Sequence, residues 1–373
     1  MKDKLSSFVM GIVTILLIGV LILFGAIIFQ ELEEMKTSAE VEDFQTVISE
    51  TANTIETKLE TPKIIENSLD NIKDNENTKN VDYSNVKVDK YFYNQLEEPS
   101  KIIYKAFESN KENMKTGTYK VELGDSFTSI LSKENGQDEL GRYYQSAIEA
   151  YTYDNPEVFY LSPNKMYLNI ETTKSSKSTK YYVYIDSGNQ SNYLTDEFSS
   201  KEQVENAINS IEQVKNSLVS RKTGNTYNDI KNVHDYLVDN LEYDTSISRN
   251  NIYDVYGALV NNVAVCEGYA RAFKYIMDSM QIPCVLVIGS GTNSQGQTEN
   301  HAWNYVQVSG NWYALDATWD DPVVSGGGKA SYESRYKYFL KGSNTFSKDH
   351  ISNGQFTPGG KIFEYPNISN QDF

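Results

Sequence analysis

The strongest constraint on this chain is an uncharged apolar run of 22 residues, Phe8 to Phe29, which reads FVMGIVTILLIGVLILFGAIIF. A helix of that length spans about 33 Å, enough for a bilayer hydrocarbon core of about 30 Å. A cleaved signal peptide is the competing interpretation, but its apolar part is only about 7 to 15 residues long and ends at a small-residue cleavage site. The run therefore predicts a transmembrane helix.

Charges beside the run predict its orientation. Lys2 and Lys4 precede it, whereas Glu31, Glu33 and Glu34 follow it. Because positive charge stays on the cytoplasmic side, the N-terminus is expected in the cytoplasm and the rest of the chain outside. We expect a single-pass cell-membrane protein whose bulk is extracellular.

The formal net charge of −17 argues against nucleic acid as a partner, since nucleic-acid binding needs a basic surface.

Composition divides the chain into four parts. Residues 1–30 form the cytoplasmic tip and the membrane helix, and residues 31–86 form a polar, acidic stalk with too few apolar residues for a core. Aromatic residues become frequent from residue 87, which predicts an N-terminal α/β subregion over 87–199 and a core region over 200–373. Periodicity predicts helices over 98–113, 144–151, 200–221 and 227–242, and a strand over 179–188.

Cys266, one of only two cysteines, precedes a helical pattern. Apolar residues recur at three- and four-residue steps from Tyr269 to Met280, and Pro283 stops the helix. Cys266 is therefore predicted in the first helical turn, where unpaired N–H groups and the helix dipole favour a thiolate. Glu267 beside it opposes that effect. The other cysteine, Cys284, lies in the apolar run CVLVIG and is interpreted as a buried structural thiol, although a bridge to Cys266 is the alternative.

A thiolate needs a basic partner, and the chain has three histidines. His234 lies on an apolar helical stripe, and His350 lies in a tail segment without a neighbouring motif, so both are interpreted as structural. His301 lies in a predicted β-hairpin, NHAWNYVQVSGNWYALDATWDDP. If Ser309 and Gly310 form a two-residue turn, His301 and Asp316 share one face as diagonal neighbours. A three-residue loop would separate them.

Cys266, His301 and Asp316 together match a Cys-His-Asp arrangement for covalent acyl transfer. Trp303 and Trp319 flank the two strand positions and are candidates for the substrate cleft, whereas Trp312 beside the turn is interpreted as packing.

Several segments resemble the transglutaminase-like fold of bacterial proteins, a branch of the papain-like superfamily. They are VCEGYARAF, QIPCVLVIGSG, NHAWNYV and WYALDATWDDP. The upstream segment YNDIKNVHDYLVDNLEYD resembles the helix that precedes the cysteine in that family, and YTYDNPEVFYL resembles the N-terminal subregion of its clostridial members. The similarity covers about residue 87 to the C-terminus. The resemblance implies an α+β fold in which the Cys266 helix packs on an antiparallel sheet carrying His301 and Asp316, within a catalytic core over 200–373.

In that family the three residues are nucleophile, general base and orienting acid. The expected activity is acyl transfer on protein or peptide amides, as a transglutaminase or as a cysteine protease or amidase, and topology suggests cell-wall or surface proteins as substrates. The alternative is an inactive transglutaminase-like module that binds such proteins. No match to the calcium loops of animal transglutaminases is present, so calcium dependence is not expected.

A third interpretation is a metal site that combines Cys266 and His301 with Asp316, Asp320 or Asp321. Zinc sites usually show close ligand pairs such as Cys-x-x-Cys, and the sequence has none. We therefore expect neither a metal nor a cofactor.

Overall fold

The computed structural model describes residues 64–69, 81–174, 178–321, 332–352 and 361–373. The apolar run predicted to cross a membrane lies outside these ranges, as does most of the predicted stalk. None of the helices within the ranges combines the length and the apolar composition that crossing a bilayer requires. The described chain has the mixed α+β fold that the sequence predicts.

The first sheet contains four strands in the order β1-β3-β4-β2. Strands β3 and β4 are antiparallel, β2 is antiparallel to β4, and β1 is parallel to β3. The bounds are Ile64–Leu69 for β1, Val121–Gly124 for β2, Tyr167–Lys174 for β3 and Thr179–Asp186 for β4. Strand β1 lies inside residues 31–86, where only a polar stalk was expected. Its structure depends on pairing with β3, about 100 residues away in sequence, which local composition does not reveal.

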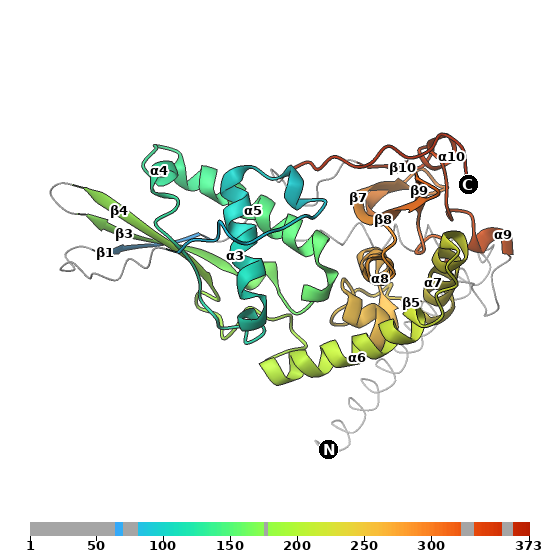
Figure 1. The fold of residues 1–373 in the computed structure, drawn as a ribbon, viewed down its shortest axis with the longest axis horizontal. Coiled ribbons are helices and arrows are strands. Elements are labelled where there is room, and N and C mark those ends of the chain that lie inside the picture. Colours follow the sequence, from blue (N-terminus) through green and yellow to red (C-terminus); the bar gives the residue numbers. More distant parts are fainter. Residues whose placement is uncertain (1–63, 70–80, 175–177, 322–331, 353–360) are drawn as a thin grey trace, which may run out of the picture. The chain divides into compact units, whose positions relative to one another are not determined.

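Three helices accompany this sheet (Figure 1): α3 (Glu98–Met114), α4 (Thr128–Leu131) and α5 (Gly136–Asp154). Helix α5 extends the helix predicted over 144–151 in both directions. Buried aromatic rings join α3 to α5, with the rings of Tyr104 and Phe107 against Tyr151. Three short 3-10 turns complete the subregion: η1 (Tyr93–Gln95), η2 (Pro156–Val158) and η3 (Pro163–Lys165).

The remaining long helices are α6 (Lys201–Val219), α7 (Thr226–Asn240) and α8 (Cys266–Ser279). Their N-terminal signals differ. The Ser200 side chain accepts a hydrogen bond from the Gln203 backbone and caps α6, and Asn225 caps α7 in the same way through Asn228. Helix α8 begins without a side-chain cap. The three helices confirm the predictions from periodicity.

The second sheet has the order β10-β7-β8-β9, and all its neighbouring strands are antiparallel. Its strands are β7 (Cys284–Thr292), β8 (Thr298–Val308), β9 (Asn311–Leu315) and β10 (His350–Ile351). Helix α8 lies against β7 and β8 (Figure 1), where the buried Asn304 amide donates to the Ala270 carbonyl at 3.0 Å. The short elements are β5 (Glu242–Tyr243), η4 (Gly257–Asn261), β6 (Val263–Ala264), α9 (Tyr332–Arg335) and α10 (Ser343–Phe346).

The described parts of the two expected subregions belong to one compact unit. Arg271 of α8 donates to the Thr152 carbonyl of α5, and Tyr91 donates to the carbonyl of Glu364 near the C-terminus. These contacts join residues that lie far apart in the sequence, so the N-terminal subregion packs on the same core that carries Cys266.

Candidate active site

Cys266 is the first residue of α8, as predicted, and its side chain is partly exposed. Gly268 allows the helix to begin here, because a Cβ atom at that position would lie 2.5 Å from the Ile252 carbonyl oxygen and 2.8 Å from the Ala264 Cβ. The opening N–H groups of the helix have no side-chain cap, so they retain the partial positive charge of a helix N-terminus. The sulfur therefore lies where an anion is stabilised.

The structure answers two questions about Cys266 that the sequence left open: the effect of Glu267 on the thiolate, and the possible disulfide to Cys284. The Glu267 carboxylate, expected to oppose a thiolate, forms an ion pair of 2.7 Å with Arg271, so its charge is compensated. Cys284 is buried at the start of β7, and both cysteines are free thiols. The structure therefore contains the buried thiol that was predicted and not the alternative disulfide.

The β8–β9 hairpin has the predicted register. Val308 pairs with Asn311, and Ser309 and Gly310 adopt positive φ angles of 51° and 83°, as in a two-residue type I′ turn. Asp316 immediately follows β9, and its Oδ2 lies 2.6 Å from Nε2 of His301. Both side chains are at most 1% exposed. The turn thus brings together two residues that are 15 positions apart.

Asp316 is held by four hydrogen bonds. Its Oδ1 accepts from the backbone N–H groups of Thr318 at 3.0 Å and Trp319 at 3.2 Å, and its Oδ2 lies near Nε2 of both His301 and His350. Burial by itself would raise the pKa of Asp316, but the charge and hydrogen bond of His301, together with His350, hold it below its ordinary value. Asp316 is therefore ionised and rigidly placed.

The two ring nitrogens of His301 have different surroundings: Nε2 faces Asp316, whereas Nδ1 does not. Nδ1 is buried and has no hydrogen-bond partner. Burial lowers the pKa of His301, yet the Asp316 carboxylate and then Cys266 outweigh burial and raise the pKa well above its ordinary value. Asp316 and Cys266 thus favour the protonated form of His301, and Asp316 anchors the ring through Nε2.

His350 is the site residue that sequence reasoning missed, because its segment has no motif. It was interpreted as structural, but the structure places it on β10 opposite Gly291, with Nε2 3.2 Å from Oδ2 of Asp316. Its ring stacks on Phe346 with centroids 4.0 Å apart. His234, by contrast, is a packed histidine as predicted, with Nε2 3.1 Å from Asp320.

Trp303 and Trp319 were predicted to line a substrate cleft, but their side chains are only 1% and 3% exposed. Trp319 stacks on His301 with centroids 4.9 Å apart, and Trp303 lies 5.9 Å from the same ring. The two rings are thus part of the buried wall around the imidazole. Gly291 makes room for this wall, since a Cβ atom there would lie 2.7 Å from the Trp319 ring.

The structure separates the acids of the hypothetical metal site. Asp320 accepts from the backbone of Tyr338 and pairs with His234, and Asp321 accepts from the Tyr269 hydroxyl. Within the described ranges, the residues grouped closely enough to share a metal are His301, Asp316 and His350, whose ligand atoms lie within 4.8 Å of one another. Nε2 of His301 and Nε2 of His350 each lie within hydrogen-bond distance of Oδ2 of Asp316.

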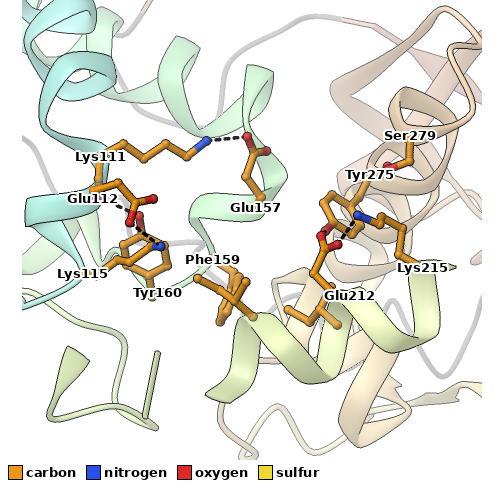
Figure 2. A pocket seen from close by; sticks show the side chains of 12 residues that line it. Lys111, Glu112, Lys115, Glu157, Phe159, Tyr160, Glu212, Lys215, Tyr275 and Ser279 are labelled. Atoms are coloured by element: carbon orange, nitrogen blue, oxygen red, sulfur yellow. Dashed lines mark hydrogen bonds and ion pairs between the residues drawn. The ribbon is translucent and has the colours of Figure 1, made fainter. Parts of the chain in front are cut away.

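A cleft of about 300 Å³ lies elsewhere, between α3, α6, α8 and the segment after η2 (Figure 2). Its walls carry Lys–Glu pairs, including Lys111 with Glu157 at 2.6 Å, and Tyr275 donates to Glu212 at 2.6 Å. Tyr275 lies near the C-terminal end of α8, whereas Cys266 begins the helix. This cleft is therefore distinct from the Cys266 site.

Comparison with known proteins shows what this part of the chain resembles. The family model described as the transglutaminase-like superfamily matches residues 212–317, a range that contains Cys266, His301 and Asp316. Kyphoscoliosis peptidase of Mus musculus is 26% identical over 151 residues, which are 36% of this chain and 23% of the relative. The Homo sapiens protein of the same name is 30% identical over 95 residues, which are 23% of this chain and 14% of the relative.

The solved structure "Crystal structure of a TGase" shares 14% sequence identity, with a TM-score of 0.28, and the match covers 46% of this chain and 49% of that one. This chain spans less than a quarter of the length of the curated relatives it matches. Residues 212–317 therefore match a transglutaminase-like domain, both in the family model and in the two peptidase relatives.

Proposed function

We propose that Cys266, His301 and Asp316 form a catalytic triad for acyl transfer on protein or peptide amides. The observation that carries the proposal is the orientation of His301. Its Nε2 is bound to Asp316 and its Nδ1 is without a hydrogen-bond partner, while Cys266 acts on the same ring from a helix N-terminus. A nucleophile, a base and an orienting acid are thus arranged in series.

The first half of the reaction follows from this arrangement. An imidazolium beside the sulfur stabilises the Cys266 thiolate, which attacks the amide carbonyl carbon and forms a C–S bond. Nδ1 of His301 then protonates the departing amine as the C–N bond breaks, which leaves an acyl-enzyme and a neutral imidazole. The backbone N–H of Cys266, in the first helical turn, is one donor for the oxyanion.

The second half of the reaction depends on the acceptor. Water gives hydrolysis, and the name of the two matched relatives, kyphoscoliosis peptidase, supports that outcome. A primary amine gives a crosslinked product, as in a transglutaminase. Both outcomes use the same acyl-enzyme, so the triad supports either.

The location of the activity is part of the proposal. The apolar run from Phe8 to Phe29 and the lysines before it support a single membrane anchor with its N-terminus in the cytoplasm. The domain would then act outside the cell, on cell-wall peptides or surface proteins. Protease digestion of intact cells tests this orientation: loss of the domain is expected, and full protection would place the domain inside.

Alkylation of Cys266 by iodoacetamide tests the triad. We would use the full chain carrying Cys284→Ser, with and without His301→Ala, and follow the rate against pH. We expect alkylation to persist well below the free-cysteine pKa of about 8.5 and to lose that behaviour without His301. Alkylation that follows an ordinary thiol in both proteins would refute the pairing and favour the inactive binding module.

A further inference from the structure

Glu299 is a buried acid that the proposed reaction does not use. It lies on β8 two residues before His301, so both side chains project from the same face of the strand. The residue is 8% exposed, and neither carboxylate oxygen has a hydrogen-bond partner. Across the ladder it faces Gly291, which has no side chain to offer a partner.

The other buried acids of the described ranges each have at least one hydrogen-bonded carboxylate oxygen. Asp154 accepts from two backbone N–H groups, Asp254 accepts from the backbone of Tyr256 and Gly257, and Asp316 has the four partners described above. Among the buried carboxylates of the described ranges, Glu299 alone has both oxygens without a partner. Such a group costs folding free energy, so a ligand that supplies a positive charge would be bound strongly.

The location of Glu299 links it to the reaction. Burial raises its pKa to about 7, His301 acts to lower it and Asp316 to raise it, so all three groups share one electrostatic environment. Because Glu299 and His301 project from one face of β8, Glu299 lies beside the proposed triad.

We propose that Glu299 binds the primary ammonium group of an acyl acceptor, such as a lysine side chain or a free N-terminal amine. This inference rests on the proposed function and assigns the acyl-enzyme to transfer in preference to hydrolysis. A carboxylate with two unpaired oxygens matches the three N–H donors and the charge of an ammonium group. Binding there would hold the acceptor nitrogen beside the acyl group on Cys266.

The transfer step balances with groups already present. The bound ammonium releases one proton to solvent, and the neutral amine attacks the thioester carbonyl carbon. The new C–N bond forms, the C–S bond breaks, and the electron pair returns to the Cys266 thiolate. The remaining extra proton of the amine passes to Nδ1 of His301, which restores the thiolate–imidazolium pair.

The experiment compares a charged and an uncharged nucleophile. The full chain is acylated with p-nitrophenyl acetate, and the acetyl group is then captured by cadaverine, which is cationic at pH 7.5, or by hydroxylamine, which is neutral. Mass spectrometry measures both products. We expect Glu299→Gln to lower the ratio of cadaverine capture to hydroxylamine capture about tenfold or more, because a charge-assisted hydrogen bond is lost. Glu364→Gln, an exposed site, is the matched control and should not change the ratio.

The possible outcomes are distinguishable. An unchanged ratio in Glu299→Gln overturns the inference, as does a wild-type protein that is acylated but never forms the cadaverine amide. Release of p-nitrophenolate that is no faster than in Cys266→Ala instead contradicts the proposed function itself. If Glu299→Gln fails to fold, Glu299→Asp serves in its place: it keeps the charge on a shorter side chain, so a partly retained cadaverine preference supports the inference and an unaltered one overturns it.

Discussion

Glu299→Gln is predicted to stabilise the folded protein at alkaline pH. The pKa of Glu299 rises from 4.5 to about 7 on folding, chiefly because the carboxyl group is buried. The folded state therefore binds a proton more tightly than the unfolded state, and the free energy of unfolding falls as pH rises from 4.5 to about 7. Above that window the wild-type protein retains an ionised, unpartnered carboxylate, whereas glutamine remains neutral.

The size of the effect follows from the shift in pKa. Each pKa unit corresponds to about 1.4 kcal/mol, so the ionised carboxylate costs about 3 kcal/mol at pH 8. Urea unfolding of the full chain at pH 4, 6 and 8 measures it. We expect Glu299→Gln to exceed the wild type by about 1 to 3 kcal/mol at pH 8 and to differ little at pH 4.

A matched control and a clear contrary result accompany this measurement. Glu364→Gln makes the same chemical change at an exposed position and should not alter the pH dependence. If Glu299→Gln is no more stable than the wild type at pH 8, then the Glu299 carboxylate has a partner in the folded protein. If its advantage is equally large at pH 4, the gain does not come from the charge of Glu299. The reasoning from an unpaired carboxylate would then be wrong.

Three further substitutions test the site and its frame. His350→Ala removes a hydrogen bond to Asp316 and should lower kcat for ester cleavage about tenfold with little change in KM. His350→Gln retains an amide donor and should recover much of the lost kcat. Steady-state kinetics of the wild type and the two variants test both expectations. Gly291→Ala places a Cβ 2.7 Å from the Trp319 ring and should cost about 1 to 3 kcal/mol in urea unfolding, whereas an unchanged midpoint would show that the ring can move. Asn304→Ala removes the buried amide that binds α8 to β8 and should lower the free energy of unfolding by about 2 kcal/mol in the same assay. A decrease below about 0.5 kcal/mol, which surface substitutions commonly cause, would contradict this role of Asn304.

Much of the site could be predicted from the sequence because its determinants are local. The turn at Ser309 and Gly310 sets the hairpin register, and a period of two residues then places His301 and Asp316 on one face. The helical spacing after Cys266 likewise places the cysteine at a helix N-terminus. Each of these inferences depends on residues within about 20 positions of one another.

The parts that were missed depend on residues distant in sequence. His350 reaches Asp316 because β10 pairs with β7, about 60 residues earlier, and nothing near His350 indicates that pairing. Strand β1 needs β3 as a partner for the same reason. Trp303 and Trp319 were interpreted as cleft residues from their positions beside the site, but the C-terminal segment that carries Phe346 and His350 covers them.

By itself, the amino-acid sequence determined the helical and strand periods, the turn, and therefore the order and orientation of Cys266, His301 and Asp316. Only the tertiary structure decided which groups compensate one another. Arg271 neutralises Glu267, four donors hold Asp316, and Glu299 is left with none. Hydrogen bonding and burial depend on distances between elements that a one-dimensional pattern does not contain, so charge compensation in this protein is a property of the fold.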